Sequence, residues 1–249
     1  MGVISLAARR ETQEYVVLNA LAAGPEPLGA GAVAEALRQA GEMASEATVG
    51  RLLKDLDTRG YTRRDGFRGR TLTAAGQFRL QELELDRDRT SKGEELIKRL
   101  KARGRDELVE VLVARRAIER ETARLAALQA TPRDIEYLMS IVKRHEEHSR
   151  AGVAAEDDTA FHRYIAQLSG NRVLEAAFDL IRQDGQLSPV LEHIRKEVKS
   201  SVATDHRRIV EALGKKDSAA AEHAMVHHIE NVIEDVERYW DLAERRERD

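Results

Sequence analysis

The chain of 249 residues contains no cysteine and few aromatic residues. Without cysteine, disulfide bridges and thiolate metal sites are excluded, so nitrogen and oxygen atoms must hold any metal ion. Aromatic side chains make up only 4% of the chain, so the core must consist mostly of Leu, Val, Ile and Ala. No apolar run approaches the ~18 residues of a membrane span. Arg9 and Arg10 follow the mildly apolar start, which is the reverse of a secretory signal. We therefore expect a cytoplasmic protein without a membrane partner.

Charged residues are abundant, at 34%, beside 42% hydrophobic residues, which is typical of a soluble, helix-rich protein. The net charge of −3 argues against a general nucleic-acid coat. Between Thr48 and Thr73, however, seven Lys and Arg side chains stand against three Asp, and all eight histidines lie beyond residue 140. This uneven distribution indicates two modules with different ligands.

Helical patterns predict three short helices before residue 60: Glu11–Leu21, Ala30–Ala40, and a third that follows the N-cap residue Ser45. Residues 61–72, with a turn at Asp65-Gly66, predict a basic β-hairpin. Three helices followed by such a hairpin are typical of a winged helix-turn-helix over residues 10–75.

In this interpretation the third helix enters the major groove of double-stranded operator DNA and the wing contacts phosphates. The predicted DNA-binding residues are Ser45, Thr48, Arg51 and Lys54 on the helix and Arg63, Arg64, Arg68 and Arg70 on the wing. The alternative is a solvated helix and hairpin that happen to carry arginine.

The segment Glu46–Gly76 (EATVGRLLKDLDTRGYTRRDGFRGRTLTAAG) resembles the winged-helix family found ahead of ribonuclease R-type and nitrogen-regulator proteins. The resemblance covers about residues 12–85. The chain lacks the "LPSERELA" start of the usual GntR-type DNA-binding domain, so no operator sequence is carried over.

Residues 76–95 are predicted to form a charged helical linker that ends near Asp88–Ser91, because Asp86-Arg87-Asp88-Arg89 has no core-forming pattern. No strand pattern follows residue 75, and Pro189 is one of several expected breaks between helices. The expected helices are Leu108–Ala127, one that begins at Pro132, Asp157–Leu168, Val173–Arg182, Glu192–Val198, Val202–Leu213 and Ser218 to about Arg245. Residues 96–245 should therefore form an all-α bundle, and the fold class is mostly α.

Histidine spacing suggests a metal site in this bundle. Asp158 and His162 are four residues apart, which places them on one helix face, and His206 and His228 lie in two later helical segments. These four side chains would converge on one divalent ion, or else they are unrelated polar residues on solvated faces.

Four segments resemble, in the right order, the FadR C-terminal (FCD) ligand-binding domain, the effector-sensing half of many GntR-superfamily regulators. They are Arg115–Glu119, Asp158–His162 with Leu168–Asn171, Asp205–Ile209 and Ala224–Ile229. The resemblance spans about residues 95–240. It implies Asp158, His162, His206 and His228 as ligands of a divalent metal, Arg115 as the partner of an acidic effector, and Asn171 near the pocket.

Imidazole and carboxylate ligands suit zinc first, with nickel, manganese or iron also compatible. Several alternatives stay open. Arg115 would otherwise pair with Glu119 on the helix surface, and His223 or His227 would replace His228 as ligand. The remaining histidines, His145, His148 and His193, are expected at the surface.

These patterns predict a homodimeric transcriptional regulator that senses a small organic acid together with a bound metal. Repressor is the expected role, since repression is the commoner outcome in the resembled family. One alternative is a metal-dependent hydrolase on the same Asp and His residues, although the chain offers no motif for a general base or an oxyanion hole. The other is a helical interaction module without a small ligand.

Overall fold

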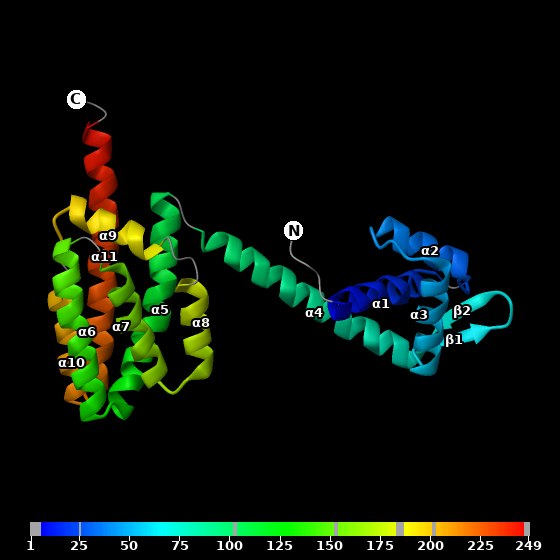
Figure 1. The fold of residues 1–249 in the computed structure, drawn as a ribbon, viewed down its shortest axis with the longest axis horizontal. Coiled ribbons are helices and arrows are strands. Elements are labelled where there is room, and N and C mark those ends of the chain that lie inside the picture. The colour runs from blue at the N-terminus through cyan, green and yellow to red at the C-terminus, as the bar shows by residue number, and fades with distance from the viewer. Residues whose placement is uncertain are drawn as a thin grey trace. The chain divides into compact units, whose positions relative to one another are not determined.

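The computed structural model describes residues 6–24, 26–101, 104–151, 154–182, 187–200 and 203–246. They form two compact units, Met1–Glu94 and Glu95–Asp249 (Figure 1). The mostly α fold class is confirmed, because helices dominate both units and a two-stranded sheet is the one sheet found in the described residues. Among these residues, no helix combines the length and the apolar composition that crossing a membrane requires.

The first unit has the predicted winged-helix order. It contains α1 (Leu6–Ala22), α2 (Ala30–Gln39), α3 (Glu46–Thr58), β1 (Thr62–Asp65) and β2 (Gly69–Leu72). Ser45 caps α3, and the apolar stripe Val49, Leu52, Leu53 and Leu56 is buried against α1 and α2. The strands β1 and β2 pair antiparallel, and Leu28 adds a bridge to Arg70 on the outer side of β2.

A buried acid holds the helices of this unit together. The carboxylate of Glu14 on α1 is only 3% exposed. It accepts hydrogen bonds from Arg59, at the end of α3, and from Arg79 on α4 (Ala74–Arg99). Burial alone would raise the pKa of Glu14, but the two arginines keep it below its ordinary value. One charged side chain therefore fixes three helices.

The predicted end of the linker helix is wrong. The helix α4 runs without interruption from Ala74 to Arg99, through the charged run at residues 86–89. Ion pairs one turn apart, Arg89–Asp86 at 3.1 Å and Lys92–Asp88 at 2.7 Å, support it. Such pairs give an exposed helix weak support that is screened by salt. Local electrostatics thus replace the missing apolar stripe.

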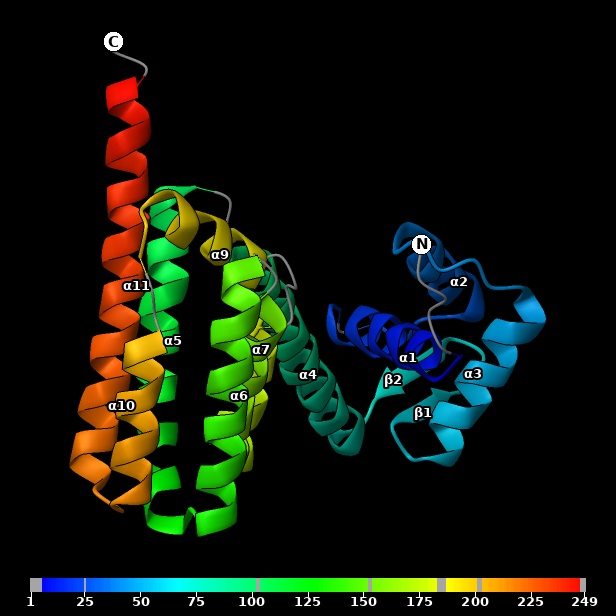
Figure 2. The same cartoon turned by 60° about the vertical axis from the view of Figure 1, so that its left-hand side comes forward.

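The described residues of the second unit form a bundle of seven helices (Figure 2). They are α5 (Arg105–Gln129), α6 (Pro132–Ala151), α7 (Ala155–Leu168), α8 (Arg172–Arg182), α9 (Leu187–Glu197), α10 (Ala203–Gly214) and α11 (Ser218–Arg246). α11 lies along α5, α10 packs against α11, and α6 and α7 lie side by side. Pro189 does not break a helix as expected, because it lies in the first turn of α9, where backbone N–H groups have no helical partner.

At Gly76, near the start of α4, the structure leaves no room for a side chain. A Cβ atom at this position would lie 2.0 Å from the carbonyl oxygen of Tyr61, whereas a Cβ at Gly50 on α3 would meet no atom within 4 Å. We expect Gly76→Ala to destabilise the winged-helix unit by about 1–3 kcal/mol through overpacking. Gly50→Ala should stabilise it by about 0.5–1 kcal/mol. Hydrogen exchange of the α1–α3 amides measures both effects, and equal protection in Gly76→Ala and wild type would contradict the packing.

Candidate metal centre

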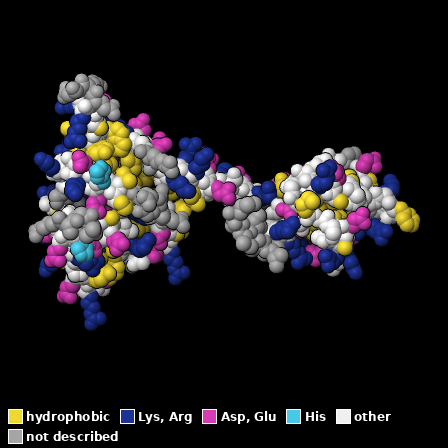
Figure 3. Space-filling view, turned by 45° about the horizontal axis from the view of Figure 1, so that its top comes forward, with side chains coloured by type: hydrophobic (Ala, Val, Ile, Leu, Met, Phe, Trp, Pro, Cys, Tyr) yellow, Lys and Arg dark blue, Asp and Glu magenta, His cyan; other side chains and the backbone are white. Residues whose placement is uncertain are grey.

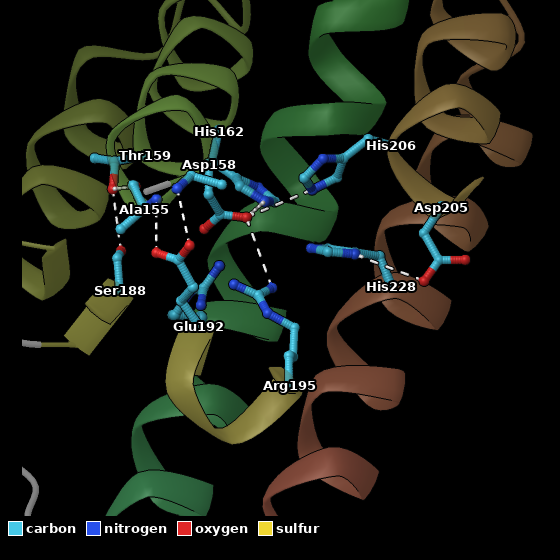
Figure 4. Close-up of polar contacts among 12 residues, drawn as sticks. Ala155, Asp158, Thr159, His162, Ser188, Glu192, Arg195, Asp205, His206 and His228 are labelled. Atoms are coloured by element: carbon cyan, nitrogen blue, oxygen red, sulfur yellow. Dashed lines mark hydrogen bonds and ion pairs between the residues drawn. The ribbon is translucent and has the colours of Figure 1, made fainter. Parts of the chain in front are cut away.

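Four buried side chains converge inside the second unit (Figure 4). Asp158 and His162 lie one turn apart on α7, His206 comes from α10 and His228 from α11. Each offers one ligand atom, and these atoms all lie within 4.8 Å of one another. In a tetrahedral site with bonds of about 2.1 Å the ligand atoms lie about 3.4 Å apart, so the most distant pair would close by about 1.4 Å at most. The structure thus brings together the four residues that the sequence suggested, as a group that could hold a metal ion.

The donor atoms of this group lack other partners. Asp158 Oδ1, His162 Nε2 and His206 Nε2 are buried, and none has a hydrogen-bond partner. The two nitrogens lie 3.8 Å and 3.6 Å from Asp158 Oδ1, too far for hydrogen bonds. Buried polar atoms without partners are costly, and ligation of a shared cation would satisfy these three atoms together.

Carboxylates lie behind the rings of two of the three histidines. Glu119 Oε2 on α5 lies 2.6 Å from His162 Nδ1, a contact that leaves Nε2 of that ring for a metal. Asp205 Oδ2 on α10 lies 3.8 Å from His228 Nδ1, beyond hydrogen-bond distance. Nothing in the sequence marks Glu119 or Asp205 for these positions, because their contacts with His162 and His228 join different helices.

Three arginines surround the cluster. Arg182 on α8 donates from Nη1 to Asp158 Oδ2 at 3.1 Å and to Ser188 at 2.8 Å, while its Nε and Nη2 have no partner. Arg195 on α9 lies 3.9 Å from Asp158 Oδ1. Arg115 pairs with Glu119 at 2.7 Å. All three arginines are buried. Arg182 and Arg195 gave no signal in the sequence, since nothing local distinguishes them from surface arginines.

Protonation states at neutral pH suit metal binding. Burial would raise the pKa of Asp158, but Arg182 and Arg195 hold it well below its usual range. Desolvation lowers the pKa of His162, takes that of His206 well below its ordinary value, and brings that of His228 to about 4. An ionised carboxylate and neutral imidazoles are the forms that ligate metals.

The other histidines differ from expectation in one case. His145 on α6 is 4% exposed and its ring packs edge-on against His206, with centroids 5.1 Å apart, so its predicted surface position is wrong. His193 is exposed, and half-buried His148 lies 2.6 Å from Asp157. On α11, His223 and His227 are exposed while His228 is buried, so burial selects His228 among the three.

The two predicted effector residues have different surroundings. Arg115 does pair with Glu119, but both side chains are buried beside the cluster instead of lying at the surface. Asn171 is exposed, and its Oδ1 accepts from the backbone N–H groups of Val173 and Leu174, which caps α8. The capping contacts account for the position of this asparagine at the start of α8, and its predicted place near an effector pocket stays a prediction.

Most of the predicted DNA-binding side chains are accessible. Arg51, Lys54, Arg63 and Arg64 are exposed. Ser45 and Thr48 form the start of α3, where the Ser45 hydroxyl accepts from Thr48 N at 3.3 Å. The face drawn in Figure 3 shows positive and negative side chains intermixed over both units.

Two wing arginines are already paired. Arg68 is 70% exposed and contacts Asp65 at 2.7 Å. Arg70 is only 17% exposed, and its Nε and Nη2 contact Asp57 at 2.8–3.0 Å. Arg70 therefore ties β2 to α3 instead of lying open to a phosphate as expected.

Comparison with known proteins agrees with both halves of this architecture. Residues 110–231 match the FCD domain, and residues 15–83 match the ribonuclease R winged-helix domain. The chain carries an FCD domain. The residues that the resemblance rested on, including the buried Asp and His group, all lie within these two matches.

Similar curated proteins are named as regulators of transcription and not as enzymes. The protein "Uxu operon transcriptional regulator" of Escherichia coli K12 is 34% identical over 131 residues, 49% of this chain and 51% of the relative. The "Putative L-lactate dehydrogenase operon regulatory protein" of the same strain is 29% identical over 147 residues, 57% of each chain. This chain thus spans about half the length of the curated relatives it matches. The solved structure "Streptococcus agalactiae GntR" has 21% identity, with 90% of this chain and 99% of that one covered and a TM-score of 0.46.

The buried histidines of the FCD domain make the metal-free protein sensitive to acid. The pKa of His228 is about 4 when folded and about 6.5 when unfolded, so between these values only the unfolded chain takes up the proton. Stability is therefore lost as the pH falls, by up to about 3 kcal/mol from this group. Urea unfolding of chelator-treated protein, followed by Trp240 emission, should show the loss between about pH 7 and about pH 4.5.

The variant His228→Gln should have a shallower pH dependence, and His193→Gln, at an exposed position, should keep the wild-type one. A wild-type stability that stays flat or rises on acidification would contradict the neutral, desolvated state of the cluster.

Proposed function

We propose that this chain is a DNA-binding transcriptional regulator whose FCD domain holds a divalent metal ion and binds a small organic acid. The observation that carries the proposal is the buried group of one carboxylate and three imidazoles whose ligand atoms lie within 4.8 Å of one another. The regulator names of the relatives support the first half of the proposal, and the chemistry of the buried group supports the second.

The proposed metal ligands are Asp158, His162, His206 and His228, with zinc as the first choice and nickel, manganese or iron compatible. A bound ion would supply a Lewis-acidic centre with coordination positions left for a carboxylate oxygen of the effector. Glu119 would hold the ring of His162 in place.

The buried charges favour an anionic effector. Three arginines (Arg115, Arg182 and Arg195) face two carboxylates, Glu119 and Asp158. A divalent cation adds further positive charge, and buried positive charge without a counter-ion is costly. The unpartnered Nε and Nη2 of Arg182 offer the forked donor geometry that binds a carboxylate. A small organic acid would supply the missing negative charge.

The winged helix would act as the DNA-binding part, with exposed Arg51 and Lys54 on α3 toward base edges and phosphates. A chain with one such unit reads a palindromic operator as a homodimer, and repression is the role we propose. Effector binding would shift helices of the bundle and so change the spacing of the two DNA-binding units across the dimer.

The metal assignment predicts the outcome of elemental analysis. Native protein should contain about one divalent ion per chain, and the double variant His206→Ala/His228→Ala should contain none, because both Nε2 donors are lost. The matched control is His223→Ala/His227→Ala, which removes two exposed imidazoles from α11 and should keep the metal. Absence of metal from native protein expressed with zinc, nickel, manganese and iron supplied would refute the proposal.

The effector assignment predicts a thermal shift. One relative is named for an L-lactate dehydrogenase operon, so L-lactate belongs in a panel of small mono- and dicarboxylic acids. With zinc present, a binding acid at ~100 times its Kd should raise the Tm by about 5 °C. Arg182→Gln should lose the shift while keeping the metal, and Arg163→Gln, exposed on α7, should keep both. If no acid stabilises the zinc-loaded protein, the anion site is wrongly assigned.

A further inference from the structure

The tip of the wing carries a phenylalanine with no protein contact to explain it. Phe67 lies in the short loop between β1 and β2, and its side chain is 104% exposed, as open as in an isolated residue. Single exposed hydrophobic residues are common, but Phe67 is the most exposed of the large hydrophobic residues in the part of the chain that the structure describes.

The loop that carries the ring is fixed by its own hydrogen bonds. Arg68 N donates to Asp65 O at 3.0 Å, and the Arg68 guanidinium pairs with the Asp65 carboxylate at 2.7 Å. Arg64 Nε donates to Gly66 O at 3.2 Å, and Gly66 has a φ of +53°, which favours glycine. The backbone therefore sets the direction of the Phe67 side chain before any partner binds.

The base of the wing is fixed as well. Arg70 exchanges two backbone hydrogen bonds with Leu28, at 2.9 and 3.0 Å, and its side chain is held by Asp57. A Cβ at Gly69 would lie 2.3 Å from the Leu28 backbone, so glycine permits this close pairing. The hairpin is thus attached to the rest of the winged helix through Leu28 and through Asp57 on α3, which fixes its position in the unit.

Positive charge surrounds the ring. Arg63, Arg64 and Arg68 are exposed around the same loop, and Asp65 is the one acid in the segment 62–72. An apolar group framed by cations complements a groove with anionic walls and an apolar floor. The minor groove of duplex DNA has that character, and apolar side chains inserted between its base steps unstack and kink the duplex. A membrane surface or a folded protein does not offer such a narrow anionic slot.

We propose that Phe67 is an apolar wedge that enters the minor groove of duplex DNA when the wing binds, with Arg63, Arg64 and Arg68 on the flanking phosphates. The inference rests on the proposed DNA-binding function and adds a residue that positions and deforms the duplex. In this proposal the wing contributes to DNA binding through an apolar contact as well as through its positive charge.

The test uses the full chain and the duplex that it enriches from a random-sequence library. Phe67→Ala should weaken binding by at least about tenfold, as expected for loss of an apolar contact of this size. The slope of log K against log salt should not change, because no cation is lost. Arg68→Ala should instead reduce that slope by about one. Phe78→Ala is the matched control, since Phe78 is 64% exposed on α4 and outside the wing, and it should bind as wild type does.

A second readout separates a wedge from a surface contact. Energy transfer between dyes on the two duplex ends reports bending, and 2-aminopurine emission at the step facing the wing reports unstacking. Both signals should appear on binding of wild type and of Phe78→Ala and fall with Phe67→Ala. Because Phe67 is fully exposed, its removal should leave the hydrogen exchange of α1–α3 unchanged.

The outcomes are distinct. Unchanged affinity and bending in Phe67→Ala would overturn the wedge while leaving DNA binding intact. Failure of wild type to enrich any duplex would refute the proposed function itself, and the wedge with it. Tighter binding of wild type to single-stranded RNA than to duplex DNA, with the loss in Phe67→Ala confined to the RNA, would also overturn the wedge, because the ring would then be a base-stacking platform.

Discussion

The buried carboxylate of Asp158 is the charge around which the second unit is built. It is 2% exposed, and both Arg182 and the neighbouring Arg195 stabilise its ionised form. Those arginines are themselves buried, so their positive charges also need nearby negative charge. The helices that carry these side chains must therefore pack so that buried charges of opposite sign meet. All seven helices contribute: Arg115 and Glu119 from α5, His145 from α6, Asp158 and His162 from α7, Arg182 from α8, Arg195 from α9, His206 from α10 and His228 from α11. Removing one partner of such a network leaves an uncompensated charge, which costs about 3–5 kcal/mol.

The same network explains why a bound ion would affect the fold and not only the site. Nitrogen atoms of four buried imidazoles, those of His145, His162, His206 and His228, have no hydrogen-bond partner among the described residues. Each unpaired polar atom opposes folding, and a cation that satisfied several of them would stabilise the native state alone. Ligand binding to the native state then shifts the folding equilibrium by mass action. The helices α7, α10 and α11 would be the ones drawn together.

Local sequence patterns predicted much of the fold, and their failures have physical causes. Helix periodicity and the Ser45 cap located the winged helix, and the spacing of Asp158 and His162 put both on one face of α7. The continuation of α4 was missed because ion pairs stabilise it in place of an apolar stripe. The sequence did not indicate the buried positions of Arg182, Arg195 and His145, because their partners lie on other helices. Arg70 was predicted to bind DNA because its pairing with Asp57, thirteen residues away, cannot be read from the sequence.

The two carboxylates held by arginines at the cluster, Glu119 and Asp158, are poorly suited to act as a catalytic base. A metallo-hydrolase needs a carboxylate or imidazole near the ion that is free to move a proton. Here Glu119 is held by Arg115 and faces His162, and Asp158 accepts from Arg182. The arginines keep the pKa values of Asp158 and Glu119 well below their ordinary range although burial opposes this, so neither group is a proton acceptor near neutral pH. Fixed cations facing a metal site can still bind and orient an anion, which is what a sensor of organic acids requires.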